Sequence, residues 1–392
     1  MMTPAANTQT SSVVRDDMGG TARNTRADMA GTAQLALRGT HENGKLPVSD
    51  DIAHGTLGLS AAAPVLDISS LTLEFPIFKG VVKALNGVNL QVHQGEIVGL
   101  VGESGSGKSV TAMAILRLLQ QDAFRVKAGS ITVLGREVFA LREPELLAMR
   151  GRDVAMIFQE PMTALNPTRK VGRQLVDVIR RHQSVSSAKA LEQAERLLRD
   201  MYIGDPVDVL NRYPFELSGG MRQRIMIALA FSCNPSLLIA DEPTTALDVT
   251  VQRQVLLLLR EKARALGTAV LFITHDMAVV SQFCDRVYVM YAGSVVEQGP
   301  TASLIETPAH PYTHALLRGL PENALPRTEL PAIPGHAPDL SALPEGCAFR
   351  DRCVFADEQC RQKPLLKPMP GVPKRAYACW HPRLIAGVDQ GE

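Results

Sequence analysis

Eight consecutive residues have the types and spacing that hold a phosphate group. The run Gly102-Glu103-Ser104-Gly105-Ser106-Gly107-Lys108-Ser109 fits G-x-x-x-x-G-K-[ST] between the apolar segment 97–101 and a helix-prone segment that begins at Val110. Glycines let the backbone turn successive N–H groups toward an anion. Lys108 adds a positive charge, and Ser109 offers an oxygen to Mg²⁺. We predict a nucleotide-binding P-loop in preference to a glycine-rich turn without a ligand.

Four short apolar runs each end at residues that can act on a phosphate. They alternate with helical segments, which indicates strands of a parallel sheet covered on both faces. The runs are residues 96–101, 154–158, 237–240 and 269–274. The first ends in the P-loop, and the others end in Gln159, Asp241-Glu242 and His275. Ligands of open α/β sheets bind at the carboxyl ends of strands, so we expect these residues to converge on one site.

A second candidate anion site closes a helical insert of residues 160–233. Leu217-Ser218-Gly219-Gly220-Met221-Arg222-Gln223-Arg224 opens an apolar helix, and a serine with two glycines at a helix N-terminus favours a bound anion. Earlier in the insert, helix-like segments are expected at 171–182 and 188–201. In the second of these segments, four apolar side chains are predicted to share one packed face: Leu191, Ala194, Leu198 and Met201.

The totals limit the class of protein. The 392 residues suffice for two or more domains, and 45% hydrophobic with 21% charged residues is ordinary for a globular chain. The net charge of +1 argues against a protein that binds nucleic acid through a basic field, so we expect no nucleic-acid partner. No stretch resembles a membrane span or a signal peptide, which predicts a cytoplasmic location.

The order of the motifs resembles the ABC-type ATPases, the nucleotide-binding subunits of membrane transporters. The resemblance runs from Val65 to Gly299 and departs at Met221, where the family most often has glutamine. The matching stretches are Walker A (102–109), the Q-loop (Gln159), the signature (217–223), Walker B (237–242), the D-loop (Ala246-Leu247-Asp248) and the switch histidine (His275).

This resemblance implies ATP hydrolysis by a head-to-tail pair of subunits, in which Ser218, Gly219 and Gly220 serve the partner's nucleotide. Glu242 would orient the attacking water, and His275 would contact the γ-phosphate. Mg²⁺ would be held by Ser109 and Gln159, with Asp241 acting through water, and Gln159 would also be a catalytic residue. Phe78 is the first candidate to stack on adenine, and Phe75 is the second. The full set of implied nucleotide-binding residues is Gly102, Glu103, Ser104, Gly105, Ser106, Gly107, Lys108, Ser109, Val110, Asp241, Ser218, Gly219, Gly220, Gln223, Asp248 and Phe78.

Two further stretches resemble the ATP-binding subunits of dipeptide and oligopeptide importers. They are the Q-loop extension 159–167 and the run His310-Pro311-Tyr312-Thr313-His314-Ala315-Leu316-Leu317. The implied partners are two permease subunits, a second ATPase subunit and an external solute-binding protein, with this chain peripheral at the cytoplasmic face of the inner membrane. Nickel, glutathione or sugars are alternative solutes. The alternative classes are a soluble ABC ATPase on ribosomes or DNA and a weakly hydrolysing regulatory subunit.

Four cysteines lie in a proline-rich tail that is too small to be stable on its own core. In a reducing compartment, a bound metal is the expected stabilising cross-link. The four cysteines are Cys347, Cys353, Cys360 and Cys379. Four thiolates suit Zn²⁺ or an iron–sulfur cluster, with His381 near. Resemblance to the peptide importers favours a [4Fe–4S] cluster over zinc or free thiols. Cys233 and Cys284 are expected to be ordinary buried residues.

The predicted fold class is α/β, a P-loop NTPase with a RecA-like, mostly parallel sheet. It includes an antiparallel β subdomain from the strand-like segments 66–68, 71–75 and 88–92, the helical insert, and the small cysteine-containing tail. The expected organisation is a disordered leader (1–63), an ABC ATPase domain (64–300) and a C-terminal extension (301–392).

Overall fold

The chain divides into two units, Met1–Gly58 and Leu59–Glu392. The computed structural model describes residues 63–78, 80–159, 164–244, 247–320 and 331–382. All of these belong to the second unit. The predicted leader up to residue 62, Ala246 of the D-loop and residues 160–163 of the Q-loop extension lie outside the described residues.

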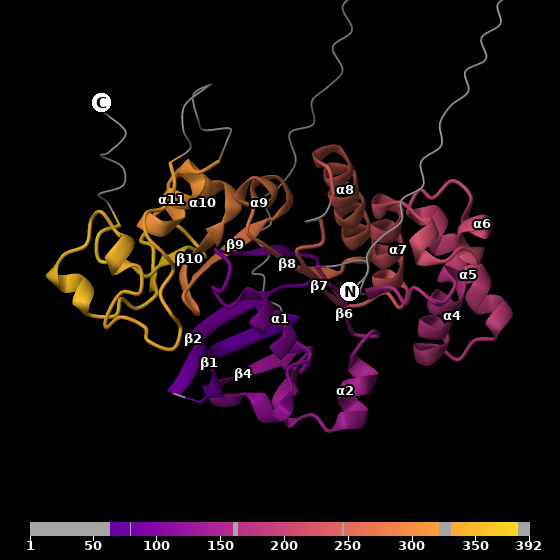
Figure 1. Ribbon diagram of the computed structural model, residues 1–392, viewed down its shortest axis with the longest axis horizontal. Coiled ribbons are helices and arrows are strands. Elements are labelled where there is room, and N and C mark those ends of the chain that lie inside the picture. The colour runs from indigo at the N-terminus through magenta and orange to yellow at the C-terminus, as the bar shows by residue number, and fades with distance from the viewer. Residues whose placement is uncertain (1–62, 79, 160–163, 245–246, 321–330, 383–392) are drawn as a thin grey trace, which may run out of the picture. The chain divides into compact units, whose positions relative to one another are not determined.

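One mixed sheet contains the strands that end at the candidate site (Figure 1). Its order is β11 (Lys367–Pro368), β12 (Ala376–Tyr377), β10 (Ser294–Pro300), β9 (Arg286–Tyr291), β3 (Ile97–Val101), β8 (Ala269–Thr274), β7 (Leu237–Asp241) and β6 (Val154–Ile157). From β9 to β6 all neighbours are parallel, whereas β10, β12 and β11 run antiparallel to their neighbours. The parallel part therefore carries several strand ends to one edge, as the sequence predicted.

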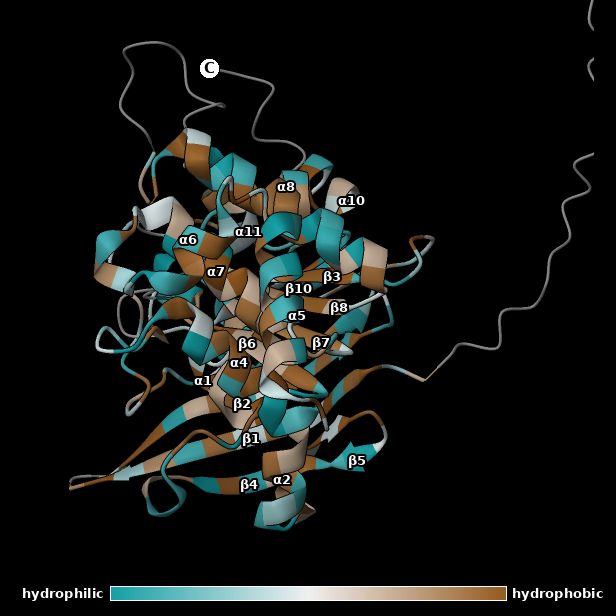
Figure 2. Ribbon diagram, turned by 90° about the vertical axis from the view of Figure 1, so that its right-hand side faces the viewer, coloured by the Kyte–Doolittle hydropathy of each residue, from teal (hydrophilic) through white to brown (hydrophobic). Residues whose placement is uncertain are grey.

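Each central strand supplies side chains to two hydrophobic cores because successive residues of a strand point to opposite faces. In β8, Val270 and Phe272 belong to one core, and Leu271 and Ile273 belong to the other. Figure 2 shows β3, β7 and β8 in the brown of hydrophobic residues. The first core includes α7 (Gly219–Phe231), α8 (Val249–Leu266) and α9 (Met277–Phe283), and the second includes α1 (Lys108–Ile115).

An antiparallel sheet covers the second core. Its order is β2 (Gly80–Val92), β1 (Leu66–Ile77), β4 (Arg125–Val133) and β5 (Arg136–Glu137), followed in the chain by α2 (Glu143–Met149). The segments predicted as half-exposed strands form β1 and β2. Buried residues of β1 and β2 pack with Val98 and Leu100 of β3, so this sheet supports the strand that leads into the P-loop.

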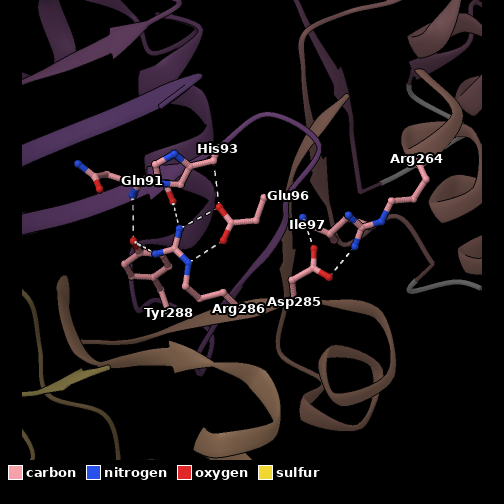
Figure 3. Close-up of polar contacts among 8 residues, drawn as sticks. All are labelled: Gln91, His93, Glu96, Ile97, Arg264, Asp285, Arg286 and Tyr288. Atoms are coloured by element: carbon pink, nitrogen blue, oxygen red, sulfur yellow. Dashed lines mark hydrogen bonds and ion pairs between the residues drawn. The ribbon is translucent and has the colours of Figure 1, made fainter. Parts of the chain in front are cut away.

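Arg286 joins the two sheets at the start of β3 (Figure 3). Its guanidinium forms a two-point ion pair with Glu96, with distances of 2.8 Å from Nε to Oε1 and 3.0 Å from Nη2 to Oε2. Nη2 also donates to the backbone oxygen of Gln91 (2.7 Å), and Nη1 donates to the hydroxyl of Tyr288 (2.6 Å). Glu96 directly precedes β3, so this network fixes where that strand begins.

The helical insert contains α4 (Val171–His182), α5 (Ser187–Asp200), α6 (Pro206–Asn211) and then α7. The two helices predicted from periodicity are α4 and α5, each within one residue of the expected start. Ala194, Leu198 and Met201 are buried as predicted. Leu191 is not: it is 47% exposed, and Ala190 and Leu197 occupy the packed face with Ala194.

The tail adds to the main sheet. After α10 (Thr301–Glu306) and α11 (Pro311–Arg318), the short strand β12 pairs with β10, placing Tyr377 opposite Glu297 (the tail is yellow in Figure 1). An ion pair of fully buried side chains, Arg375 Nη2 to Glu297 Oε1 at 3.1 Å, fixes the contact. None of the helices in the described part of the chain is long and apolar enough to cross a membrane.

Candidate functional site

The P-loop connects β3 to α1, and two of its glycines are required by close backbone contacts. Gly102 has φ +153°, and a Cβ there would lie 2.2 Å from the carbonyl oxygen of Met290. Gly107 has φ +104°, and its Cβ would lie 2.7 Å from the carbonyl oxygen of Ala84. Any side chain at these positions would push the loop away from the strands that support it.

Lys108 is buried at the first position of α1 and is held by the loop itself. Its Nζ donates to the carbonyl oxygens of Gly102 (2.8 Å) and Glu103 (2.9 Å). Burial lowers the pKa of Lys108, while the negative charges of Glu242, Asp241 and Glu103 oppose that shift. The lysine therefore sits among acidic groups that a bound polyphosphate can replace as its partners.

The predicted strand-end residues do come together. Gln159, after β6, donates from Nε2 to Oε2 of Glu242 at 2.9 Å. His275, after β8, places Nδ1 2.9 Å from the other carboxylate oxygen of Glu242. At the next strand end, Ser109 Oγ donates to Oδ1 of Asp241 at 3.3 Å. Glu242 is thus oriented from two sides, next to the serine and aspartate of the P-loop edge.

The same edge fits a hard divalent cation. Ser109, Asp241 and Gln159 supply hydroxyl, carboxylate and amide oxygens, the ligands that Mg²⁺ prefers. Burial raises the pKa of Asp241, and the charge of Glu242 adds to this, while the Ser109 hydrogen bond and Lys108 oppose it. A cation bound here would relieve the cost of placing two carboxylates side by side.

The signature forms the N-terminus of α7, as predicted. Ser218 is the N-cap, and its Oγ accepts from the N–H of Met221 (3.3 Å), while Gly219 is exposed. Gln223 differs from the expectation, because its side chain is only 1% exposed and both its polar atoms lack a hydrogen-bond partner. A buried side chain cannot reach a nucleotide at the surface, so we do not assign Gln223 to nucleotide binding.

Three other predicted nucleotide residues have distinct surroundings. Asp248 caps α8, accepting from the N–H of Val251 at 2.9 Å. Phe78 is 99% exposed at the end of β1. Phe75, the second candidate for adenine, packs beside Phe124 with ring centroids 6.4 Å apart. Of the two phenylalanines, Phe78 is the more exposed to a ligand, because Phe75 is half-buried.

The tail cysteines gather around one another, and all six cysteines of the chain are free thiols. The Cys347 N–H donates to the carbonyl oxygen of Cys360 (2.9 Å). This approach needs Gly346 at φ +84°, because a Cβ there would lie 2.3 Å from the same oxygen. Burial raises the pKa of Cys379 to about 12, and the charges of Cys347, Cys353 and Cys360 contribute to that rise.

A histidine and a carboxylate border this cysteine group. Within the described chain, the one group of three ligand atoms lying within 4.8 Å of one another comprises Asp357, Cys360 and His381. His381 Nε2 lies 3.1 Å from Oδ1 of Asp357, and the His381 N–H donates to Cys379 Sγ at 3.3 Å. The donor set at this place, one buried thiol with an imidazole and an exposed carboxylate, suits a borderline metal.

The sequence did not predict that the tail touches the P-loop. Arg352 forms a two-point ion pair with Glu103, and the hydroxyl of Tyr312 accepts from the N–H of Glu103. In sequence, the run that contains Tyr312 indicates only a family resemblance. Arg352 carried no signal, because it lies 249 residues from its partner.

A P-loop at the edge of a mostly parallel sheet, with a glutamine after β6, a glutamate after β7 and a histidine after β8, defines an ATPase of the ABC class. The family model described as ABC transporter matches residues 85–245. The model described as oligopeptide/dipeptide transporter, C-terminal region, matches residues 296–360. The chain belongs to the ABC transporter family, among the ATP-binding subunits of the oligopeptide and dipeptide type.

Similar proteins agree with this placement. A "Probable D,D-dipeptide transport ATP-binding protein DdpD" of Escherichia coli (strain K12) is 63% identical over 320 residues, which cover 82% of this chain and 97% of the relative. The "Oligopeptide transport ATP-binding protein OppD" of Salmonella typhimurium is 45% identical over 318 residues, covering 81% and 94%. A dimeric structure of the ATP-binding cassette MJ0796 with ADP and Pi is similar with a TM-score of 0.54 and 26% identity, covering 60% of this chain and 98% of that one.

Proposed function

We propose that this chain is the ATP-hydrolysing subunit of a membrane importer for peptides. The C-terminal family match and the peptide and dipeptide transporters among its relatives support this solute class. The protein would act as a peripheral subunit at the cytoplasmic face of the membrane. Its partners would be two permease subunits, a second ATPase subunit and an external solute-binding protein.

The orientation of Glu242 is the observation that carries the proposed chemistry. Gln159 and His275 each contact one oxygen of its carboxylate, at 2.9 Å in both cases. A carboxylate fixed in this way can orient a water and accept its proton during attack on the γ-phosphate. His275 could then contact the γ-phosphate itself. Mg²⁺, when held by Ser109 and Gln159, would neutralise charge on the phosphates.

The exposed signature supports a paired arrangement. The N-terminus of α7 offers backbone N–H groups and a positive helix end, which favour a phosphate, and Ser218 and Gly219 are exposed there. We infer that Ser218, Gly219 and Gly220 close over the nucleotide of a second subunit. The dimeric form of the similar cassette supports such a pair. Phe78, exposed at the end of β1, would stack on adenine.

A groove of about 740 Å³ on the helical insert supports the permease contact. It lies among α4, α5 and α6 and begins directly after the Q-loop extension, with Thr168 and Arg169 in its lining. Its walls include Leu191 and Val207, which are 47% and 54% exposed. The lining also includes the basic residues Arg169, Lys170, Arg173 and Arg180, and a groove that combines apolar and charged side chains suits a short amphipathic helix of a permease subunit.

The four tail cysteines would hold a metal centre, with a [4Fe–4S] cluster as the leading assignment. A tetrahedral Zn²⁺ with bonds of about 2.3 Å would need sulfur atoms about 3.8 Å apart. The trio that lies within 4.8 Å instead comprises Asp357, Cys360 and His381. The charges of Cys347, Cys353 and Cys360 act on the thiol of Cys379, and this mutual proximity supports one centre on the four cysteines. Zn²⁺ on the Asp357 trio is the alternative.

The test of the ATPase assignment is Glu242→Gln in the assembled transporter. We expect ATP turnover to fall at least about 100-fold, because the amide cannot accept the proton of the water. ATP binding should persist, since the P-loop is unchanged. The matched control is Glu261→Gln, a glutamate on α8 that contacts the hydroxyl of Tyr202 instead. Unchanged turnover in Glu242→Gln would refute the assignment.

A further inference from the structure

The cysteine-bearing tail binds Glu103, the second residue of the P-loop. Arg352 Nη1 lies 2.6 Å from Glu103 Oε2, and Nη2 lies 3.0 Å from Oε1. This is the fork geometry in which arginine binds a carboxylate most strongly. The Arg352 side chain is 7% exposed and that of Glu103 is 29% exposed, so water screens the pair only partly.

Arg352 is itself held rigidly. Its guanidinium carbon lies 5.8 Å from the ring centroids of both Tyr291 and Phe349. Nε donates to the carbonyl oxygen of Pro334 at 2.8 Å, and Nη1 lies 3.2 Å from the hydroxyl of Tyr291. A side chain fixed by two rings and a backbone oxygen loses little further freedom when it binds a carboxylate. The Arg352 side chain is therefore already ordered in the position from which it binds the P-loop.

A second tail residue holds the backbone of the same glutamate. The hydroxyl of Tyr312 accepts from the N–H of Glu103 at 2.8 Å. Tyr312 is fully buried, with its ring 4.6 Å from that of Tyr291 and 5.4 Å from that of Phe349. Both the main chain and the side chain of Glu103 are thus fixed by residues beyond the ATPase core.

The charge of Glu103 matters because its loop must accept a polyanion. The carbonyl of this residue accepts a hydrogen bond from Lys108, so the carboxylate is part of the same short loop that would surround the phosphates. Without a partner, its negative charge would repel ATP and compete for Lys108. Arg352 neutralises the negative charge of this carboxylate and holds the Glu103 side chain against the tail.

We propose that Arg352 is a positioning residue for ATP binding, which neutralises and anchors Glu103 so that the P-loop presents a net attraction to phosphate. Tyr312 assists by holding the Glu103 backbone. The tail is then part of the nucleotide site, although it contributes no group that touches the nucleotide.

The test is binding of the non-hydrolysable analogue AMP-PNP with Mg²⁺ to the purified full chain, measured by calorimetry. Arg352→Gln should weaken binding about tenfold, in the range of couplings between directly interacting residues. Arg350→Gln is the matched control: it lies on the same short turn, but its guanidinium contacts Asp351 and the carbonyl oxygen of Glu345 instead. That control should bind within about twofold of the wild type.

The double variant separates charge from folding. Adding Glu103→Gln to Arg352→Gln should restore affinity to within about threefold of the wild type, because the unpaired carboxylate is gone. Should Arg352→Gln fail to fold, Arg352→Lys with and without Glu103→Gln completes the same cycle, since lysine keeps the charge but not the fork. Wild-type affinity in the arginine variant, or a loss that Glu103→Gln does not rescue, would overturn the proposal.

Discussion

The backbone conformation and several contacts of Glu242 together fix the position of its side chain. Its backbone has φ +46°, a left-handed conformation that costs a residue with a side chain about 1–3 kcal/mol. The conformation is held by its N–H, which donates to the carbonyl oxygen of Ile273 at 2.9 Å, and by the two side-chain contacts to Gln159 and His275. A strained residue fixed from three sides at a strand end is what a pre-oriented catalytic carboxylate requires.

His310 gives a prediction about pH. Complete burial lowers its pKa from the ordinary 6.5 to about 3, and its Nδ1 accepts from the N–H of Tyr312. Between these two values the unfolded chain binds a proton that the folded chain does not. The free energy of unfolding should therefore fall as the pH decreases below about 6.5, by about 1.4 kcal/mol per pH unit from this group.

Urea unfolding of the full chain at several pH values between 7.5 and 5 measures this effect. His310→Asn keeps an acceptor at the start of α11 but cannot take up the proton, so its stability should depend less on pH than that of the wild type. His336→Asn changes an exposed histidine and should keep the wild-type slope. Equal slopes in all three proteins would show that His310 does not control acid stability.

The sequence allowed the convergence of Gln159, Glu242 and His275 to be predicted because each follows an apolar run, and parallel strands end at one edge. The burial of Gln223 was not predictable in the same way, since its position in the signature says nothing about which face of α7 packs. Arg352 was out of reach for another reason. Its contact with Glu103 depends on how the tail folds back, and no local pattern records a pairing across 249 residues.

At the scale of elements, long periodic segments were predictable and short ones were not. The helices α4 and α5 have clear apolar periods, and the buried strands β3 and β8 are continuous apolar runs. The strands β11 and β12 have only two residues each: β12 forms on the edge that β10 offers, and β11 forms on β12. Such strands are set by tertiary contacts, so no propensity in a proline-rich tail indicates them.

The groove among α4, α5 and α6 gives a prediction at this scale. Val207→Glu replaces an exposed apolar side chain of the groove with a charge and should reduce copurification of the permease subunits about tenfold, because the apolar contact at the interface is lost. Leu257→Glu on α8 is the control, since Leu257 is 46% exposed and lies outside the groove. Nucleotide binding by the isolated chain should be unchanged in both. Normal assembly of Val207→Glu would place the permease contact elsewhere.

Across the described chain, the tail packs against the ATPase core and stabilises it. Arg375 pairs with Glu297 of β10, Tyr312 and Arg352 hold Glu103 of the P-loop, and the N–H of Lys83 in β2 donates to the carbonyl oxygen of Leu340 at 3.0 Å. These contacts reach three separate parts of the ATPase core. A tail without a large core of its own gains its order from them and from whatever binds its cysteines.

The cysteine site gives the last prediction. The full chain purified without oxygen should contain iron and acid-labile sulfide and absorb visible light, because four converging thiols suit a [4Fe–4S] cluster. Cys353→Ser should lose most of the iron. It should also weaken AMP-PNP binding in the same direction as Arg352→Gln, since Arg352 directly precedes Cys353 on one short turn and moves when that turn loses its anchor.

Cys233→Ser is the control for these measurements, because Cys233 lies at the end of the helical insert, apart from the tail, and is half-buried where the sequence predicted a buried residue. It should keep both the iron and the affinity. Zinc in place of iron would favour the site of Asp357, Cys360 and His381, and a chain with neither metal would leave the thiols free. Cys353→Ser could lose its metal and still bind AMP-PNP like the wild type. That result would mean that the rings of Tyr291 and Phe349 hold the Arg352 side chain without the metal, and that the metal stabilises only the tail.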